Sequence, residues 1–179
     1  MSNQKFFIDC WKQELLITTN CLRHVPEDKW NWQPHGKTRS AKQLIDHIVC
    51  HAEDLAEGVE TGVINHRLSI EFPSVEKAIK DFEKYSAKLL ELVANTTDED
   101  WNTKSVPLRV FGHTAFELYM RDMCWRLFFD VIHHRGQLSI YYRPMGVPNP
   151  SIYGPTAEIM EARMSELKEA TMAEMESSN

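Results

Sequence analysis

Three polar side chains stand where the apolar pattern of helical segments faces inward. Asp130 and His134 are four residues apart, so on a helix both side chains point to the same side. His47 lies on the inward stripe of an earlier amphipathic segment, whereas His133 points roughly 100° away from His134 and is expected outside the site. A carboxylate buried without a partner is costly. Two imidazoles and one carboxylate that converge from two helices therefore indicate a divalent metal ion.

The predicted ligands would leave part of the coordination sphere free, and the same residues also allow other interpretations. Two histidines and one carboxylate leave coordination positions for water or substrate, which is typical of catalytic metal sites. His51, one turn after His47, is either an alternative ligand or a hydrogen-bond partner of the ligands. Without a metal, Asp130 could pair with Arg126, or the three predicted ligands could form only a hydrogen-bonded cluster.

Helical periodicity predicts the elements that position these side chains. The first amphipathic helix ends before Pro26. The second begins at Ser40, where Gln43 completes a capping box. The third is capped by Ser74 and ends near Asn95. Each of these helices carries one apolar stripe, which indicates packing against the others.

The second half of the chain continues this pattern. A linker over residues 96–113 contains one short turn of helix at 98–101. The longest helix is predicted to open with a capping box at Thr114 and to run to about Arg143, where Pro144 stops it. This helix is apolar on nearly all sides, so it lies at the centre of the molecule or is shared with a partner subunit.

No alternating pattern of useful length indicates a strand. The sequence therefore predicts one all-α domain over residues 1–179, with a four-helix bundle at about 5–155 and an additional amphipathic helix at about 156–176. The charged side chains of that last helix form a solvated face. Its methionines, together with the apolar fourth helix, favour a homodimer over a monomer.

Composition excludes several functional classes. The net charge of −6 argues against a nucleic-acid-binding surface. No apolar window is long enough to cross a membrane, and Asp9 and Glu14 interrupt the region where a signal peptide would be apolar. The four cysteines form no Cys-x-x-Cys pair and are expected to be reduced, as in a cytoplasmic protein.

Three sequence segments resemble the DinB/YfiT superfamily. The most specific is DVIHHRGQLSIYYRPMGVP at residues 130–148, which is followed by PSIYGPTA at 150–157. The segment SAKQLIDHI at 40–48 is similar to the part of the family that ends in its first histidine. The resemblance extends over roughly residues 5–160.

The resemblance implies a four-helix bundle with up-down-down-up order, often homodimeric, that holds nickel or zinc through three side chains. The first ligand falls on His47 and the last on His134. The middle ligand, a histidine in many members, falls on Asp130 here. A carboxylate is a harder donor than an imidazole, so zinc, nickel, manganese and iron all remain compatible.

Characterised relatives include transferases that join low-molecular-weight thiols to electrophiles. By that resemblance the chain is expected to be a metal-dependent enzyme acting on small molecules, of the thiol S-transferase or hydrolase type. None of the four cysteines stands out as a nucleophile, so a thiol would be a cosubstrate. The alternative is a non-catalytic, stress- or damage-associated metal-binding bundle.

Overall fold

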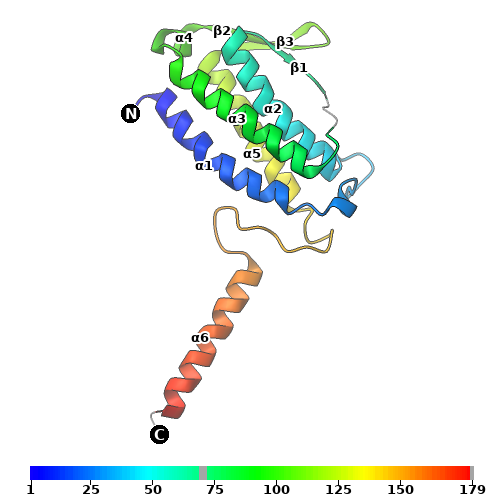
Figure 1. Cartoon of the computed structure of the whole chain (residues 1–179), viewed down its shortest axis with the longest axis vertical. Helices are drawn as coiled ribbons and strands as arrows, with labels where there is room; N and C mark the ends of the chain where they lie inside the picture. The colour runs from blue at the N-terminus through cyan, green and yellow to red at the C-terminus, as the bar shows by residue number, and fades with distance from the viewer. Residues whose placement is uncertain (69–71, 178–179) are drawn as a thin grey trace.

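Amphipathic helices make up most of the chain, and the longest of them pack into a bundle. The computed structural model describes residues 1–68 and 72–177 (Figure 1). The bundle helices are 20 or 21 residues long and bury their apolar faces against one another. They are α1 (Asn3–Arg23), α2 (Ala41–Thr61), α3 (Val75–Asn95) and α5 (Met120–Ser139).

The helices follow the predicted order. In Figure 1, α1 and α5 run in one direction and α2 and α3 in the other. The Gln4 side chain donates to the carbonyls of Val93 and Thr96 near the end of α3, so α1 and α3 are antiparallel. Tyr142 donates to the Cys21 carbonyl at 2.6 Å, which places the ends of α5 and α1 side by side. The up-down-down-up bundle is therefore confirmed.

Helix starts predicted from capping residues are confirmed at α2 and α3. Ser40 and Gln43 exchange side-chain and backbone hydrogen bonds of 2.9 and 3.2 Å, which satisfies two backbone donors at the start of α2. Ser74 caps the first turn of α3, and that helix ends at Asn95. The short helix α4 (Asp98–Thr103) lies where a turn of helix was expected.

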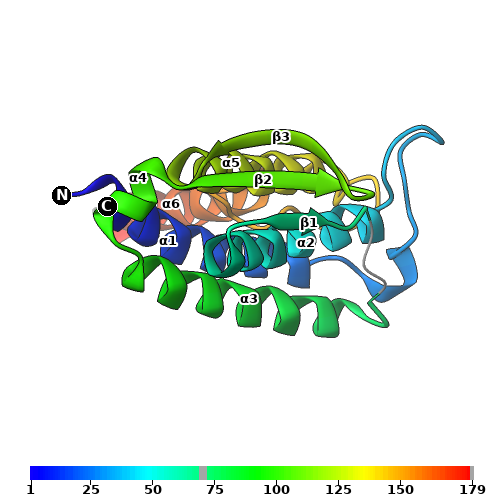
Figure 2. The same cartoon turned by 90° about the horizontal axis from the view of Figure 1, so that it is seen from above.

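A small sheet is the main departure from the sequence analysis, which expects no strands. Its strands are β1 (Ile64–His66), β2 (Ser105–Val110) and β3 (His113–Tyr119), with β1 parallel to β2 and β2 antiparallel to β3. Figure 2 shows the sheet along the α2–α5 side of the bundle, where β1 contacts α2 and β3 contacts α5. The chain is thus mainly helical, as predicted, with one sheet added.

The predicted start of the fourth bundle helix is wrong. Thr114 and Glu117 belong to β3, and α5 begins only at Met120. It ends at Ser139, and the residues up to Arg143 form turns. The capping-box spacing is short and occurs in strands as well, so it does not by itself locate a helix.

Two features of the β2–β3 hairpin explain why this segment is extended. Val106 and Leu108 are buried between more exposed neighbours, which is the two-residue period of a half-buried strand. Phe111 and Gly112 form the turn with φ of 51° and 79°. Two consecutive residues with positive φ match the right-handed twist of a two-residue hairpin.

The C-terminal helix α6 (Ala157–Ser177) extends away from the bundle (Figure 1) and confirms the helix predicted at 156–176. Its apolar side chains are exposed, including Met164 at 48% and Leu167 at 62%. The homodimer stays a prediction. Among the described residues, none of the helices is long and apolar enough to cross a membrane.

A buried ion pair joins α5 to α1, and the loop after α5 binds to this pair. Arg135 on α5 is 1% exposed, contacts the Glu14 carboxylate and donates to the Thr18 hydroxyl at 3.1 Å. Tyr153, from the loop, donates to Glu14 at 2.9 Å and contacts Arg135. Removing one member of such a pair leaves an uncompensated charge in a desolvated place.

We expect Glu14→Gln to lower the free energy of unfolding by about 3 kcal/mol, because it leaves the buried Arg135 guanidinium without its counter-charge. Urea denaturation measures the change. The control is Glu158→Gln, which breaks the exposed pair with Arg143 and should leave the stability nearly unchanged. Equal effects of the two substitutions would contradict a structural role for the buried pair.

Candidate metal centre

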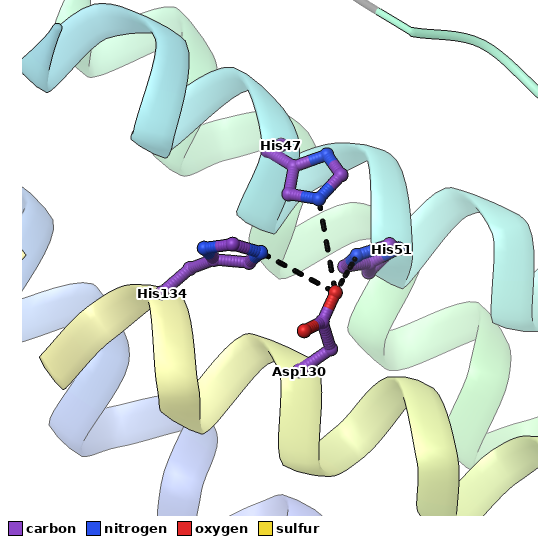
Figure 3. A group of neighbouring side chains, drawn as sticks. All are labelled: His47, His51, Asp130 and His134. Carbon is purple, nitrogen blue, oxygen red and sulfur yellow. Dashed lines mark hydrogen bonds and ion pairs between the residues drawn. The ribbon is translucent and has the colours of Figure 1, made fainter. Parts of the chain in front are cut away.

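Four side chains from two helices converge in the bundle, and we call them the donor cluster: His47, His51, Asp130 and His134 (Figure 3). The Nε2 atoms of His51, His134 and His47 lie 2.7, 3.3 and 3.7 Å from Oδ2 of Asp130. One potential ligand atom from each residue lies within 4.8 Å of all the others. This spacing would let a single cation contact all four atoms.

Helix geometry explains the convergence. His47 and His51 are four residues apart on α2, and Asp130 and His134 are four residues apart on α5, so each helix presents two donors on one face. The helices pack with these faces together. Tyr141, just after α5, donates to the Arg39 carbonyl just before α2 at 3.0 Å, which holds the two helix ends in place.

Burial keeps the imidazole of His47 neutral. Desolvation, together with the nearby His51, lowers the pKa of His47 to about 3. Its Nε2 lone pair is therefore available at neutral pH. Its Nδ1 is buried and has no hydrogen-bond partner among the described residues.

The carboxylate of the cluster is ionised. Hydrogen bonds from His134 and His51 hold the pKa of Asp130 well below its usual range. Burial acts to lower the pKa of His51, but its hydrogen bonds with Asp130 and Asp54 raise it above the usual value. Three imidazole nitrogens facing one carboxylate oxygen form a set of nitrogen and oxygen donors that suits a first-row divalent metal. The residues present therefore fit the ion that the donor pattern indicates.

A second layer of hydrogen bonds orients the donors. Asp54 is 4% exposed and accepts from Nδ1 of His51 at 3.3 Å and from Nδ1 of His66, on β1, at 2.7 Å. Asp54 thus holds a proton on Nδ1 of His51, and a cation at the cluster would take the place of the proton that Nε2 shares with Asp130. Nδ1 of His134 similarly lies 2.8 Å from the Gln137 side-chain oxygen. Carboxylate–histidine pairs of this kind are common behind metal ligands.

A cavity of about 500 Å³ lies against the donor cluster. It is bounded by α2, by α5 and by the three strands, so the sheet forms one wall of the site. His47, His51 and Asp130 all line it. The donors are therefore largely buried and yet open to a small molecule from the cavity.

The structure brings together His47, Asp130 and His134, as the sequence analysis predicts, and adds His51 to them. Their roles as ligands stay a prediction. The ion pair between Asp130 and Arg126 does not form, because Asp130 faces the histidines. The cluster held by hydrogen bonds alone stays an open interpretation.

His133 is exposed and lies outside the donor cluster, but it lines the cavity. The sequence analysis missed Asp54 and His66. Asp54 follows His47 by seven residues and His51 by three, so the helical stripe could have revealed it. His66 gave no such signal, because it reaches the site from a strand that pairs with a distant part of the chain.

Comparisons with known proteins agree with this architecture. The family model of the DinB superfamily matches residues 12–138. A DinB-like protein of Bacillus subtilis (YjoA) has a similar structure, with 19% identity, a TM-score of 0.62, and coverage of 82% of this chain and 96% of that one.

A DinB-like protein of Bacillus cereus ATCC 10987 is similar to the same extent, with 20% identity, a TM-score of 0.64, and coverage of 82% and 95%. Among curated protein sequences, none matches the chain significantly. The two solved structures support the fold, and the family model covers well over half of the sequence. The chain belongs to the DinB superfamily.

Proposed function

We propose that the donor cluster binds one divalent metal ion and that the protein is a metal-dependent enzyme acting on small molecules. The observation that carries the proposal is the position of the cluster, which is largely buried yet faces a cavity of about 500 Å³. Imidazole donors favour zinc or nickel, and the Asp130 carboxylate is also compatible with manganese or iron. A site that served only to stabilise the bundle would not need this access.

The proposed reaction is transfer of a low-molecular-weight thiol to an electrophile, or hydrolysis of a small molecule. A divalent ion would supply Lewis acidity and lower the pKa of a water or thiol that it coordinates. The protein's own thiols do not fit the part of nucleophile. Burial raises the pKa of Cys21 to about 11 and that of Cys50 to about 12. The thiol therefore comes as a cosubstrate.

His66 is placed to handle a proton in this reaction. Its Nδ1 donates to Asp54 at 2.7 Å, which leaves Nε2 as the acceptor, and its ring lines the cavity. The ring centroid lies 5.7 Å from that of His47. An imidazole that a carboxylate holds in one tautomer beside a metal site can take a proton from a reacting water or thiol.

The alternative is a non-catalytic metal-binding bundle with a role in stress or damage. Metal binding alone would satisfy both functions, so turnover separates them.

We expect the protein, purified without a histidine tag, to contain about one divalent metal ion per chain by elemental analysis. His134→Ala should weaken metal binding more than about 100-fold, because it removes a ligand. His133→Ala removes the neighbouring exposed imidazole and should keep the wild-type metal content. A metal-free wild-type protein that fails to bind added zinc or nickel would leave only the hydrogen-bonded cluster.

We expect Asp54→Asn to weaken metal binding by about 10- to 100-fold, because the amide no longer holds His51 and His66 as the carboxylate does. Competition with a chelating dye gives the dissociation constant, and thermal unfolding of the metal-free protein reports any loss of fold. Glu57→Gln is the matched control, since Glu57 lies on the same helix and bonds to Asn65 of β1 instead. Equal affinities of the two variants would rule out the support by Asp54.

We expect the metal-loaded protein to turn over cysteine with chlorodinitrobenzene, or to hydrolyse nitrophenyl acetate, and to lose this activity on chelation. His66→Gln should lower kcat by about 100-fold at unchanged metal content, because the proton acceptor is lost. His133→Gln, at the cavity but outside the donor cluster, is the control. Full metal occupancy without turnover in either the thiol-transfer or the ester-hydrolysis assay would favour the non-catalytic alternative.

A further inference from the structure

A permanent cation, the guanidinium of Arg126, lines the cavity beside the donor cluster. Arg126 lies on α5 one turn before Asp130, and its Cζ atom is 4.4 Å from the centre of the Phe116 ring. Two carboxylates of α5 lie four residues from Arg126: Asp130 faces the histidines, and Asp122 pairs with Arg121. In the part of the chain that the structure describes, no carboxylate pairs with the Arg126 guanidinium.

The walls of the cavity between Arg126 and the donor cluster are mostly apolar. The sheet contributes one wall and α5 the other. Phe129, on the α5 side, is 60% exposed, although a large aromatic side chain gains from burial. The apolar lining consists of Leu108, Val110, Ala115, Phe116, Leu127 and Phe129.

Helix geometry separates the cation from the donor cluster. Four residues on an α-helix rise by about 6 Å along its axis. The Arg126 side chain reaches the Phe116 ring of β3, and Asp130 is turned to the histidines. A single ligand could therefore place its reacting group at the donor cluster, its apolar body along the walls and an anionic group at Arg126.

We propose that the substrate is an amphipathic organic anion and that Arg126 is the residue that selects its negative group. The inference rests on the proposed function, since it names the substrate class of the same site. Arginine suits this task because its planar guanidinium stays charged and can bind a carboxylate with two parallel hydrogen bonds. Stacking on Phe116 holds the guanidinium at the cavity and leaves its edge free for the anion.

The test compares two probes that differ only at one end, mercaptohexanoate and mercaptohexanol. Isothermal titration calorimetry measures their affinities for the zinc-loaded and for the zinc-free protein. We expect wild-type protein to prefer the carboxylate probe by about fivefold, a modest factor because the cation is solvent-exposed. Arg126→Gln should remove the preference, and Arg126→Lys should keep part of it.

Arg109→Gln is the matched control. Arg109 lies on β2 between the lining residues Leu108 and Val110, but it is exposed and does not line the cavity. This variant removes the same charge beside the cavity and should keep the fivefold preference. Thermal unfolding of each variant checks that the fold is intact.

The outcomes separate this inference from the proposed function. No carboxylate preference in the wild type, or a preference that Arg126→Gln leaves unchanged, overturns the role of Arg126. If each probe binds the zinc-free protein as tightly as the zinc-loaded protein, the metal-dependent function fails. The preference compares two probes within one state of the protein, so it still tests Arg126 in that case.

Discussion

The rotation of α2 and α5 about their own axes is the constraint on which the site depends. Each helix carries two members of the donor cluster, and a rotation by one residue, about 100°, would take them out of reach of one another. Buried apolar side chains on either side of the donors fix this rotation, among them Leu44 and Ile48 on α2 and Leu127 and Val131 on α5. The apolar core therefore supplies the stability that holds four polar groups together where they would otherwise be unfavourable.

The sheet is joined to the donor cluster through one carboxylate. Asp54 on α2 binds His51 of the cluster and His66 of β1, and β1 pairs with β2 along residues 64–66. The strand that closes the cavity is thus fixed by the same side chain that orients a donor. Because Asp54 is buried, hydrogen bonds with both histidines keep its pKa below the usual value in spite of the desolvation. The wall of the cavity and the electrostatics of the site therefore depend on each other.

Local signals in the sequence predicted the helices and the meeting of distant donors. The capping residues Ser40 and Ser74 mark real helix starts because their side chains satisfy backbone donors within one turn. The same reasoning failed at Thr114, where pairing with β2 decides the conformation and cannot be seen locally. His66 was not predicted for the same reason. A three-residue strand has no periodicity of its own, and its position depends on pairing with β2, far along the chain.

The separation of Arg126 from Asp130 shows how the fold overrides a helix rule. In an isolated helix two opposite charges four residues apart attract each other, but an exposed pair of this kind contributes only about 0.3–0.5 kcal/mol. Hydrogen bonds that involve charged groups contribute about 1.5–3 kcal/mol, and Asp130 gains such a bond from His51 at 2.7 Å. Asp130 therefore bonds to the histidines, and the Arg126 guanidinium at the cavity has no carboxylate partner among the described residues. The same interaction that assembles the donor cluster thus leaves a cation free to act on a ligand.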